Sequence, residues 1–433
     1  MSWHDDYNSK RMSAEKAVSM IQSGSRVFYG GNANMPLALM RAAAERCKSL
    51  ENVKMTHVLV LGEDPLAAPE MAPHVRHHSL FVGPSDRLAV NEGRADYVPI
   101  FLYEIPRIFE TSFPLDVAMV QVSKPDEHGF MSFGLEALAA RAAIQNAKKV
   151  IVQVNEKTPR VLGNAFVHVS RVDAVVEHTE PMTSLTPRPA SDIEKKIGGF
   201  IRGLIEDGSC IQMGIGGIPD AVFNSLDGLH DLGIHTEMLS DGAMRAIQRG
   251  IVTGARKNIH QGKAVITFAL GSQELYDFLD NNPMIEAQPV EYCNDPYVVS
   301  QNEKMVAVNG AIEVDITGQV CSDSIGTRIF SGFGGQVDYI RGAARSKGGK
   351  PIIALPATGK SKDGKMFSKI VPMLKPGAGV VTTRADVHYV VTEYGVAELF
   401  GRNLHQRAEA LINVAHPDFR SELTQMAKDR RIL

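Results

Sequence analysis

Cysteine is scarce in this chain of 433 residues, which contains only four. None of the four belongs to a C-x-x-C pair or has a histidine nearby at zinc-finger spacing. This pattern argues against a disulfide framework and a zinc finger. We predict buried, reduced thiols at positions Cys47, Cys210, Cys293 and Cys321.

Long apolar runs and an excess of basic residues are also missing. No stretch approaches the roughly 18 consecutive apolar residues of a membrane span. The first 16 residues are polar and of mixed charge, without the apolar centre of a signal peptide. The net charge of −3 and the pI of about 6.5 provide no basic surplus for nucleic acid. We therefore expect a cytoplasmic protein whose partners are small molecules, not nucleic acids or membranes.

Apolar and β-branched runs alternate with helical patterns along the chain. Such alternation, with strands that are apolar on both faces, predicts an α/β fold with mostly parallel sheets. The expected strands are Val58–Leu61, Ala118–Val122, Val150–Val154, Ala264–Leu270, Met305–Asn309, Ile352–Pro356 and Val387–Val391. The expected helices include Met35–Arg46, Leu135–Lys148 and Ala190–Asp207.

Three segments recur in the same order about 180–190 positions later. Gly24–Asn32 is echoed by Gly208–Gly216, Val53–Leu59 by Gly233–Leu239, and Asp126–Ser132 by Asp315–Ser322. The repetition predicts two duplicated open α/β domains, residues 1–185 and 186–433, joined at a seam rich in proline, serine and threonine, Pro181–Pro189. Duplicated halves commonly bind a ligand between them, so we expect an active-site cleft there.

The two copies differ at the end of one expected strand, where the first carries His57 and the second carries Glu237. An unpaired carboxylate is costly to bury. Ser240–Gly242 follows as a turn signal, so Glu237 is expected where a strand ends and a loop opens, a usual place for site residues. A glutamate that pairs with an arginine or caps the next helix would explain the pattern equally well.

Two glycine clusters are candidate binding loops. Gly214–Pro219 follows an expected strand and opens a helix, where backbone N–H groups can hold an anion, although a tight turn would need the same glycines. Pro219 replaces the last glycine of the dinucleotide fingerprint, so that reading is rejected. The second cluster, Ser331–Gln336, leaves N–H groups free to face an oxygen, or is simply an unstructured loop.

Two other patterns do not support a site. Gly359–Ser361 looks like the end of a phosphate loop, but Ala354 stands where that motif requires glycine. His74, His77 and His78 have no acidic or cysteine partner at suitable spacing, so we expect a surface loop and predict no metal site.

The motifs taken together closely resemble the acetyl-CoA hydrolase/transferase family, in particular its 4-hydroxybutyrate CoA-transferase and butyryl-CoA:acetate CoA-transferase branch. The resemblance covers nearly the whole chain. It rests on four segments in this order, Gly214–Pro219, His235–Met238, Ser240–Gly242 and Gly332–Gln336. Each glycine motif alone is unspecific, whereas the combination is specific.

The resemblance implies a two-domain α/β fold and a role for several residues. Glu237 would be the covalent nucleophile, and the Gly30-Gly31-Asn32 turn would face the acyl group. The residues implied to contact CoA are Gly214, Ile215, Gly216, Gly217 and Ile218, with Gly334 and Gly335, which would also help form an oxyanion site, and further candidates Asn294, Ser331 and Lys347. CoA would be a substrate, and no cofactor is implied.

The implied reaction moves CoA between an acyl-CoA and a short-chain carboxylate, such as acetate, butyrate or 4-hydroxybutyrate, by a ping-pong mechanism through a glutamyl-CoA thioester. An acyl-CoA hydrolase using the same site is the closest alternative. A nicotinamide-dependent oxidoreductase would need the fingerprint that Pro219 interrupts, and a non-catalytic CoA sensor would form no covalent adduct. Symmetric assemblies are common, so we expect a homo-oligomer.

Overall fold

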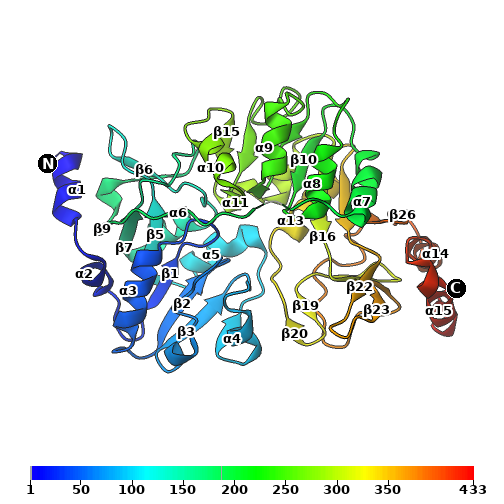
Figure 1. Cartoon of the computed structure of the whole chain (residues 1–433), viewed down its shortest axis with the longest axis horizontal. Coiled ribbons are helices and arrows are strands. Elements are labelled where there is room, and N and C mark those ends of the chain that lie inside the picture. The colour runs from blue at the N-terminus through cyan, green and yellow to red at the C-terminus, as the bar shows by residue number, and fades with distance from the viewer. Residues whose placement is uncertain (1, 187) are drawn as a thin grey trace. The chain divides into compact units, whose positions relative to one another are not determined.

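The computed structural model describes residues 2–186 and 188–433, which divide into two compact units (Figure 1). The first unit comprises Met1–Thr186 and Val265–Cys293, and the second comprises Pro187–Ala264 and Asn294–Leu433. Two sequential halves, 1–185 and 186–433, would place Val265–Cys293 in the second half instead. Backbone hydrogen bonds explain the difference, because Ala137 N–H donates to the Thr267 carbonyl at 2.9 Å and Ala269 N–H to the Leu135 carbonyl at 3.0 Å.

The first unit is built on a seven-stranded sheet in which all neighbours are parallel. Its order is β4 (Ala95–Tyr97), β3 (Val75–Ser79), β2 (Val53–His57), β1 (Arg26–Tyr29), β5 (Leu115–Val122), β7 (Ala147–Val154) and β9 (Ala174–Glu177). A smaller antiparallel pair consists of β6 (Phe130–Ser132) and β8 (Phe166–His168). The short strands β13 (Ala264–Ile266) and β15 (Ile285–Ala287) pair with each other.

The second unit contains a six-stranded sheet that is parallel except at one edge, where β25 and β26 are antiparallel. Its order is β11 (Gly233–Ile234), β10 (Cys210–Met213), β16 (Met305–Gly310), β21 (Lys350–Ala354), β25 (Tyr389–Thr392) and β26 (Gly395–Glu398). Short strands outside this sheet are β12 (Met238–Leu239), β17 (Glu313–Asp315), β18 (Val320–Cys321), β19 (Ser324–Ile325), β20 (Arg328–Ile329), β22 (Thr358–Lys360), β23 (Met366–Ser368) and β24 (Ile370–Val371). The predicted α/β class with mostly parallel sheets is confirmed.

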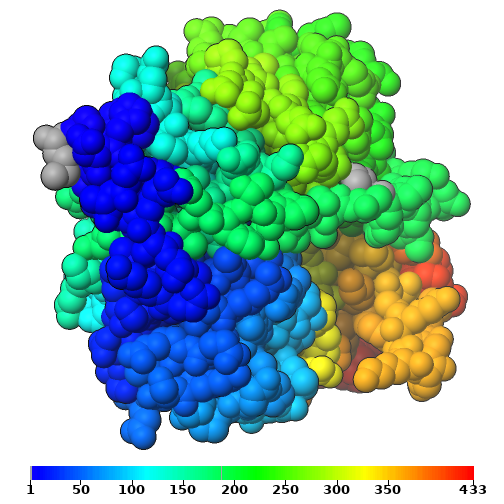
Figure 2. Space-filling model, turned by 60° about the vertical axis from the view of Figure 1, so that its left-hand side comes forward, coloured from blue at the N-terminus to red at the C-terminus, as the bar shows by residue number. Residues whose placement is uncertain are grey.

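Helices connect the parallel strands within each unit, and in the second unit α8 packs against both α7 and α9 (Figure 1). The first unit has α1 (Trp3–Lys10), α2 (Ala14–Val18), α3 (Leu37–Cys47), α4 (Arg87–Asn91), α5 (Ile105–Glu110), α6 (Ala140–Asn146), α10 (Gln273–Leu279) and α11 (Val290–Cys293), with 3₁₀ turns at Pro69–Met71, Leu102–Glu104 and Val169–Arg171. The second has α7 (Asp192–Arg202), α8 (Gly217–Asn224), α9 (Asp241–Gln248), α12 (Pro296–Ser300), α13 (Gln336–Arg345), α14 (Leu404–Asn413) and α15 (Pro417–Asp429). Figure 2 shows α1 and α2, in dark blue, on the surface of the first unit.

The order of the strands supports the duplication. β1 lies between β2 and β5 in one sheet, as β10 lies between β11 and β16 in the other. The third echo has the same local structure in both copies, since Gly129 N–H donates to the Asp126 carbonyl at 3.0 Å and Gly318 N–H to the Asp315 carbonyl at 2.8 Å. Both glycines have positive φ, 83° and 98°, a conformation that favours glycine.

Strand register corrects one detail of the comparison between the copies. Lys54 pairs with Arg26 in the first sheet, and Gly233 pairs with Cys210 in the second. Arg26 and Cys210 hold the same place in the repeat, so Val58, not His57, is the counterpart of Glu237. Because side chains alternate along a strand, this shift of one residue means that His57 points to the face of the sheet opposite to the one faced by Val58, the counterpart of Glu237.

Most of the expected elements are present, with some differences in their limits. Ala118–Val122, Val150–Val154 and Met305–Asn309 fall within β5, β7 and β16, and the expected strands at 352–356 and 387–391 overlap β21 and β25. Ala264–Leu270 is divided between β13 and β14 (Phe268–Ala269), and the helix expected at 135–148 is reduced to α6. The expected strand Val58–Leu61 is wrong, because this segment follows β2 as a loop in which the Leu59 carbonyl accepts from Asn32 N–H.

Two further expectations are wrong. Ser240–Gly242 does not form a turn, because the Ser240 hydroxyl accepts from Ala243 N–H at 3.4 Å and caps the first turn of α9. The histidines at 74–78 do not form a surface loop, since His77 and His78 lie in β3 and His77 is buried.

All four cysteine side chains are buried, as predicted. Burial raises the pKa of the Cys210 thiol to about 11, which keeps it protonated near neutral pH. Across residues 2–186 and 188–433, no helix is both long enough and apolar enough to cross a bilayer.

Candidate functional site

The carboxylate of Glu237 is held by hydrogen bonds within the second unit. Glu237 lies between β11 and β12, and its Oε2 accepts from Asn294 Nδ2 at 2.9 Å. The same amide nitrogen donates to Oδ2 of Asp338 at 3.2 Å, and the Tyr339 hydroxyl donates to Oδ1 of Asn294 at 3.5 Å. Asp338 and Tyr339 belong to α13, so this helix fixes the amide that orients Glu237.

The environment of Glu237 disfavours its charged form. Burial raises the pKa of the Glu237 carboxyl to about 7, although the hydrogen bonds from the Asn294 amide and the Gly335 N–H act in the opposite direction. Part of the residue remains exposed. No arginine or lysine forms an ion pair with it in the described part of the chain, and Ser240 caps α9 instead. Neither conventional explanation, an arginine partner or a helix cap, accounts for this glutamate.

Gly335 allows the backbone to approach this carboxylate. The residue precedes the first turn of α13, and a Cβ atom at this position would overlap both Oε2 of Glu237 and Nδ2 of Asn294. Its φ of −92° is open to any residue, whereas Gly334 has a φ of 56° that favours glycine. The second cluster is therefore an ordered loop that presents the Gly335 N–H to Glu237.

The other glycine cluster lines a pocket of about 280 Å³ in the second unit. Gly216 has a φ of 121° and precedes α8, so the turn needs glycine there, and Pro219 lies in the first turn of the helix as predicted. The pocket is lined by Gly214, Ile215, Gly216, Gly217, Ile218 and Pro219, together with Arg188, Glu194, Val308, Asn309, Gly310 and Ala354. Five of the predicted CoA-contact residues therefore lie in one pocket.

Arg188 and Glu194 form one wall of this pocket. Arg188 donates from Nη1 and Nη2 to the two oxygens of Glu194, at 3.0 and 2.6 Å. The hydrogen bond from this guanidinium is the main cause that lowers the pKa of Glu194 to about 2. A Cβ at Gly217 would overlap the Glu194 carboxyl group, so the ion pair and the turn fit each other.

Glu237 and this pocket lie at the same edge of the sheet. The hydroxyl of Thr236 donates to the carbonyl of Met213 at 3.4 Å, and Met213 ends β10 immediately before the Gly214 turn. Active sites of open α/β sheets commonly lie at this carboxyl edge.

The weaker candidates are distributed differently. Asn294 contacts Glu237 directly. Ser331 lies in the loop before Gly334, where its N–H donates to the Asp323 carbonyl at 2.9 Å. Lys347 lies beyond the far end of α13 and pairs with Glu303 at 3.3 Å, and its carbonyl accepts from Lys304 N–H just before β16. It is therefore at the amino-terminal edge of the sheet, away from Glu237.

Sequence reasoning missed several residues that shape these sites. Asp338, Tyr339, Arg188 and Asn309 belong to this group in the second unit. In the first unit, Oε2 of Glu136 accepts from Gly31 N–H at 3.3 Å, and burial raises the pKa of Glu136 to about 7. A carboxylate beside the Gly30–Asn32 turn carries no local sequence signal, since more than a hundred positions separate it from the turn.

Comparison with known proteins decides the family. The model of the acetyl-CoA hydrolase/transferase N-terminal domain matches residues 1–187, and that of the C-terminal domain matches residues 271–427. The chain belongs to the acetyl-CoA hydrolase/transferase family. The resemblance seen in the glycine and glutamate motifs is thereby confirmed.

Individual members of the family are similar over nearly their full length. The chain is 47% identical to the 4-hydroxybutyrate coenzyme A transferase of Clostridium kluyveri, with 99% of this chain and 100% of that protein aligned. It is 49% identical to the succinyl-CoA:acetate/propanoyl-CoA:succinate CoA transferase of Fasciola hepatica, over 96% and 87%. The crystal structure of 4-hydroxybutyrate CoA-transferase from Porphyromonas gingivalis superposes with a TM-score of 0.85 at 41% identity, over 99% and 100%. The prediction of a CoA-transferase type of enzyme is confirmed at the level of the family.

Proposed function

We propose that this chain is a CoA-transferase that moves CoA between an acyl-CoA and a short-chain carboxylate, such as acetate, butyrate or 4-hydroxybutyrate, through a glutamyl-CoA thioester on Glu237. One observation carries the proposal: a carboxylate without a cationic partner in the described residues, oriented by Asn294 and approached closely by the Gly335 backbone. The names of the relatives support the class of reaction.

The reaction needs only nucleophilic exchange at two carbonyl carbons. A Glu237 oxygen attacks the acyl-CoA carbonyl, the carbon–sulfur bond breaks, and CoA thiolate leaves a mixed anhydride. The thiolate attacks Cδ of Glu237, which releases the first acid and forms glutamyl-CoA. The second carboxylate attacks Cδ and expels thiolate, and the thiolate then attacks the new acyl carbon. Glu237 is regenerated as a carboxylate, without net transfer of protons or electrons.

The groups that hold the Glu237 carboxylate are suited to stabilise its intermediates. Each attack on Cδ develops negative charge on an oxygen of Glu237. Asn294 Nδ2 and the Gly335 N–H are the donors beside this carboxyl group. A preorganised donor of this kind typically contributes about 3–4 kcal/mol to the transition state. We infer that Asn294 and Gly335 form the oxyanion site.

The glycine-lined pocket provides groups for the anionic body of CoA. Backbone N–H groups at the start of α8, together with the Arg188 guanidinium, attract phosphate oxygens. Binding energy from this part of the substrate would position the thioester and drive attack by a carboxylate, which is a modest nucleophile. Lys347 is left out of this proposal because it lies at the other edge of the sheet.

We predict that kcat/KM for an acyl-CoA rises with pH up to about 7 and then becomes constant. Glu237 attacks in its charged form, and burial raises its pKa to about 7, so the attacking form is depleted below that pH. The measurement is a profile of kcat/KM between about pH 5.5 and 8.5, a range in which short carboxylic acids are already ionised. A flat profile would show that this carboxyl group ionises near its usual pKa.

The covalent step is tested by mass spectrometry of the protein mixed with an acyl-CoA but no acceptor acid. We expect an adduct of the mass of CoA on the peptide that contains Glu237, and reduction by borohydride should remove it, as expected for a thioester. Incubation with free CoA alone is the control, because it supplies no activated acyl group. An adduct on a different residue would contradict the site assignment.

The balance between transfer and hydrolysis is measured separately. Release of CoA from an acyl-CoA is followed with and without acetate. A transferase requires the acceptor acid, whereas a hydrolase passes the glutamyl intermediate to water. Turnover that is independent of acetate would replace the transferase proposal with the hydrolase.

A further inference from the structure

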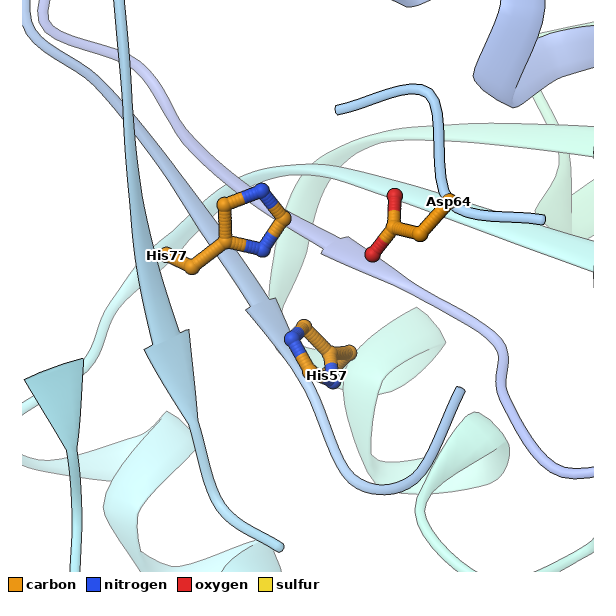
Figure 3. A group of neighbouring side chains, drawn as sticks. All are labelled: His57, Asp64 and His77. Carbon is orange, nitrogen blue, oxygen red and sulfur yellow. The ribbon is translucent and has the colours of Figure 1, made fainter. Parts of the chain in front are cut away.

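The first unit contains a cluster of ionisable side chains that the CoA-transfer reaction does not use. His57 ends β2, His77 lies in the neighbouring strand β3, and Asp64 belongs to the loop that follows β2. One nitrogen or oxygen atom from each residue lies within 4.8 Å of the others. Figure 3 shows the three side chains directed toward one another. Strand register explains this, since His77 pairs with Met55 and Ser79 with His57, which places both histidines on one face.

Several polar atoms in and beside this cluster make no hydrogen bond. Both ring nitrogens of His57 and Nε2 of His77 are buried and make no hydrogen bond, and the same is true of Oδ2 of Asp86. Asp86 lies beside the cluster, with Oδ2 at 3.5 Å from Nε2 of His57. Buried polar atoms are nearly always satisfied in native proteins, so Nδ1 of His57, Nε2 of His77 and the long contact between His57 and Asp86 require a physical explanation.

The charge of the cluster points to a cation. Asp86 is fully buried and Asp64 is partly buried, and no lysine or arginine pairs with either among the residues that the structure describes. Imidazole nitrogens and carboxylate oxygens are common protein ligands of a metal ion, and a divalent cation would compensate the two carboxylates.

We propose that His57, Asp64 and His77 form a divalent metal site of the zinc class. Two imidazoles and one carboxylate suit Zn²⁺ and its neighbours Co²⁺ and Ni²⁺, whereas Mg²⁺ and Ca²⁺ prefer ligands that are all oxygen. The fourth position would be taken by water. The bound metal would link the loop that carries Asp64 to strands β2 and β3.

Neighbouring groups are placed to orient the ligands. The Tyr29 hydroxyl donates to Oδ2 of Asp64 at 3.0 Å, and Asp86 faces one ring nitrogen of His57. Such outer contacts commonly set the orientation and basicity of metal ligands. Ligand atoms around zinc lie about 3.3 Å apart, so binding must draw the present atoms together. Asp64 is partly exposed on a loop and can supply this movement.

The proposal is tested on the full chain after treatment with a chelator. Co²⁺ serves as the probe because its visible absorption reports coordination by protein ligands. We expect one Co²⁺ per chain, displaced by Zn²⁺, and a higher unfolding temperature in the presence of either ion. Absence of both the absorption and the thermal shift would overturn the proposal, and would favour a protonated His57 paired with Asp86.

Matched variants distinguish this site from adventitious binding by surface histidines. Asp64→Asn and His77→Gln should each weaken Co²⁺ binding at least about 100-fold, since loss of a mere outer contact costs 10–100-fold. His78→Gln is the control, because His78 follows His77 in β3 but contacts Arg26 and Asp96 instead. Asp64→Asn is nearly isosteric at a partly exposed position and keeps the test valid if His77→Gln fails to fold. Equal Co²⁺ affinity in wild type and Asp64→Asn would overturn the assignment.

Discussion

Replacement of Glu237 by glutamine is expected to lower CoA exchange by at least about 10⁴-fold while the chain remains folded. Loss of a covalent nucleophile typically has an effect of this size or larger. Glutamine keeps the volume of the side chain and an oxygen that accepts from Asn294 Nδ2, so the packing around the site is preserved. The measurement is the rate of acyl-CoA formation from a second acid, with thermal unfolding as the test of folding.

The raised pKa of Glu237 also predicts how the Glu237→Gln substitution changes the stability of the folded chain. In the folded chain the pKa of Glu237 is raised from 4.5 to about 7. Because the folded state binds this proton more tightly than the unfolded chain does, the folded state loses stability as the pH rises from about 4.5 to about 7. Glu237→Gln removes this penalty and should unfold at a higher temperature than wild type at about pH 8, but not at about pH 5. Glu422→Gln is the control, because Glu422 is exposed on α15 and should leave both activity and unfolding unchanged. Full exchange activity in Glu237→Gln would refute the proposed mechanism.

Substitution of Gly335 by alanine should reduce kcat by about 100-fold. The added Cβ would overlap the Glu237 carboxylate and the Asn294 amide. The carboxylate must therefore move by about an ångström, and a displacement of that size at a reacting atom commonly costs two orders of magnitude in rate. The φ of −92° at this position accepts alanine, so the effect should arise from sterics and not from backbone strain.

Separate measurement of kcat and KM, together with a control substitution at another glycine, isolates this steric effect on Glu237. CoA itself is bound mainly elsewhere in the proposal, so KM should change much less than kcat. Gly199→Ala is the control, because Gly199 lies inside α7 with open space around its Cα and alanine favours a helix. A Gly335→Ala enzyme with wild-type kcat would show that the close approach of this backbone to Glu237 is not needed for catalysis.

Local patterns were sufficient to predict the class of fold and to single out Glu237 as the candidate nucleophile. Buried parallel strands such as β5 and β7 are continuous apolar runs, and their residues identify them without tertiary information. Glu237 stood out because a carboxylate ended an apolar run. The glycines at 216 and 334 mark positions of positive φ that few other residues tolerate.

Features that depend on long-range contacts could not be predicted in the same way. The His57, Asp64 and His77 cluster forms because β2 and β3 are neighbours in register, whereas the search for ligands used spacing along the chain. Polar residues on a helix usually face solvent, and only the fold shows that Asp338, on α13, contacts Asn294. Lys347, a CoA contact implied by the family resemblance, lies beyond the far end of α13, and only the fold shows that this helix separates it from Gly335 and Glu237.

The segment Val265–Cys293 constrains how this protein is made on the ribosome. Asn281 N–H donates to the Arg160 carbonyl at 2.9 Å, and Ala287 N–H to the Leu162 carbonyl at 2.8 Å. Domains usually mature in order as they emerge, N-terminal part first. Here the earlier part of the chain must wait for a stretch translated more than a hundred codons later, after residues 188–264 have already emerged. The first unit can therefore complete its folding only after part of the second unit has been synthesised. A gene fragment that ends at residue 186 would encode an incomplete first unit.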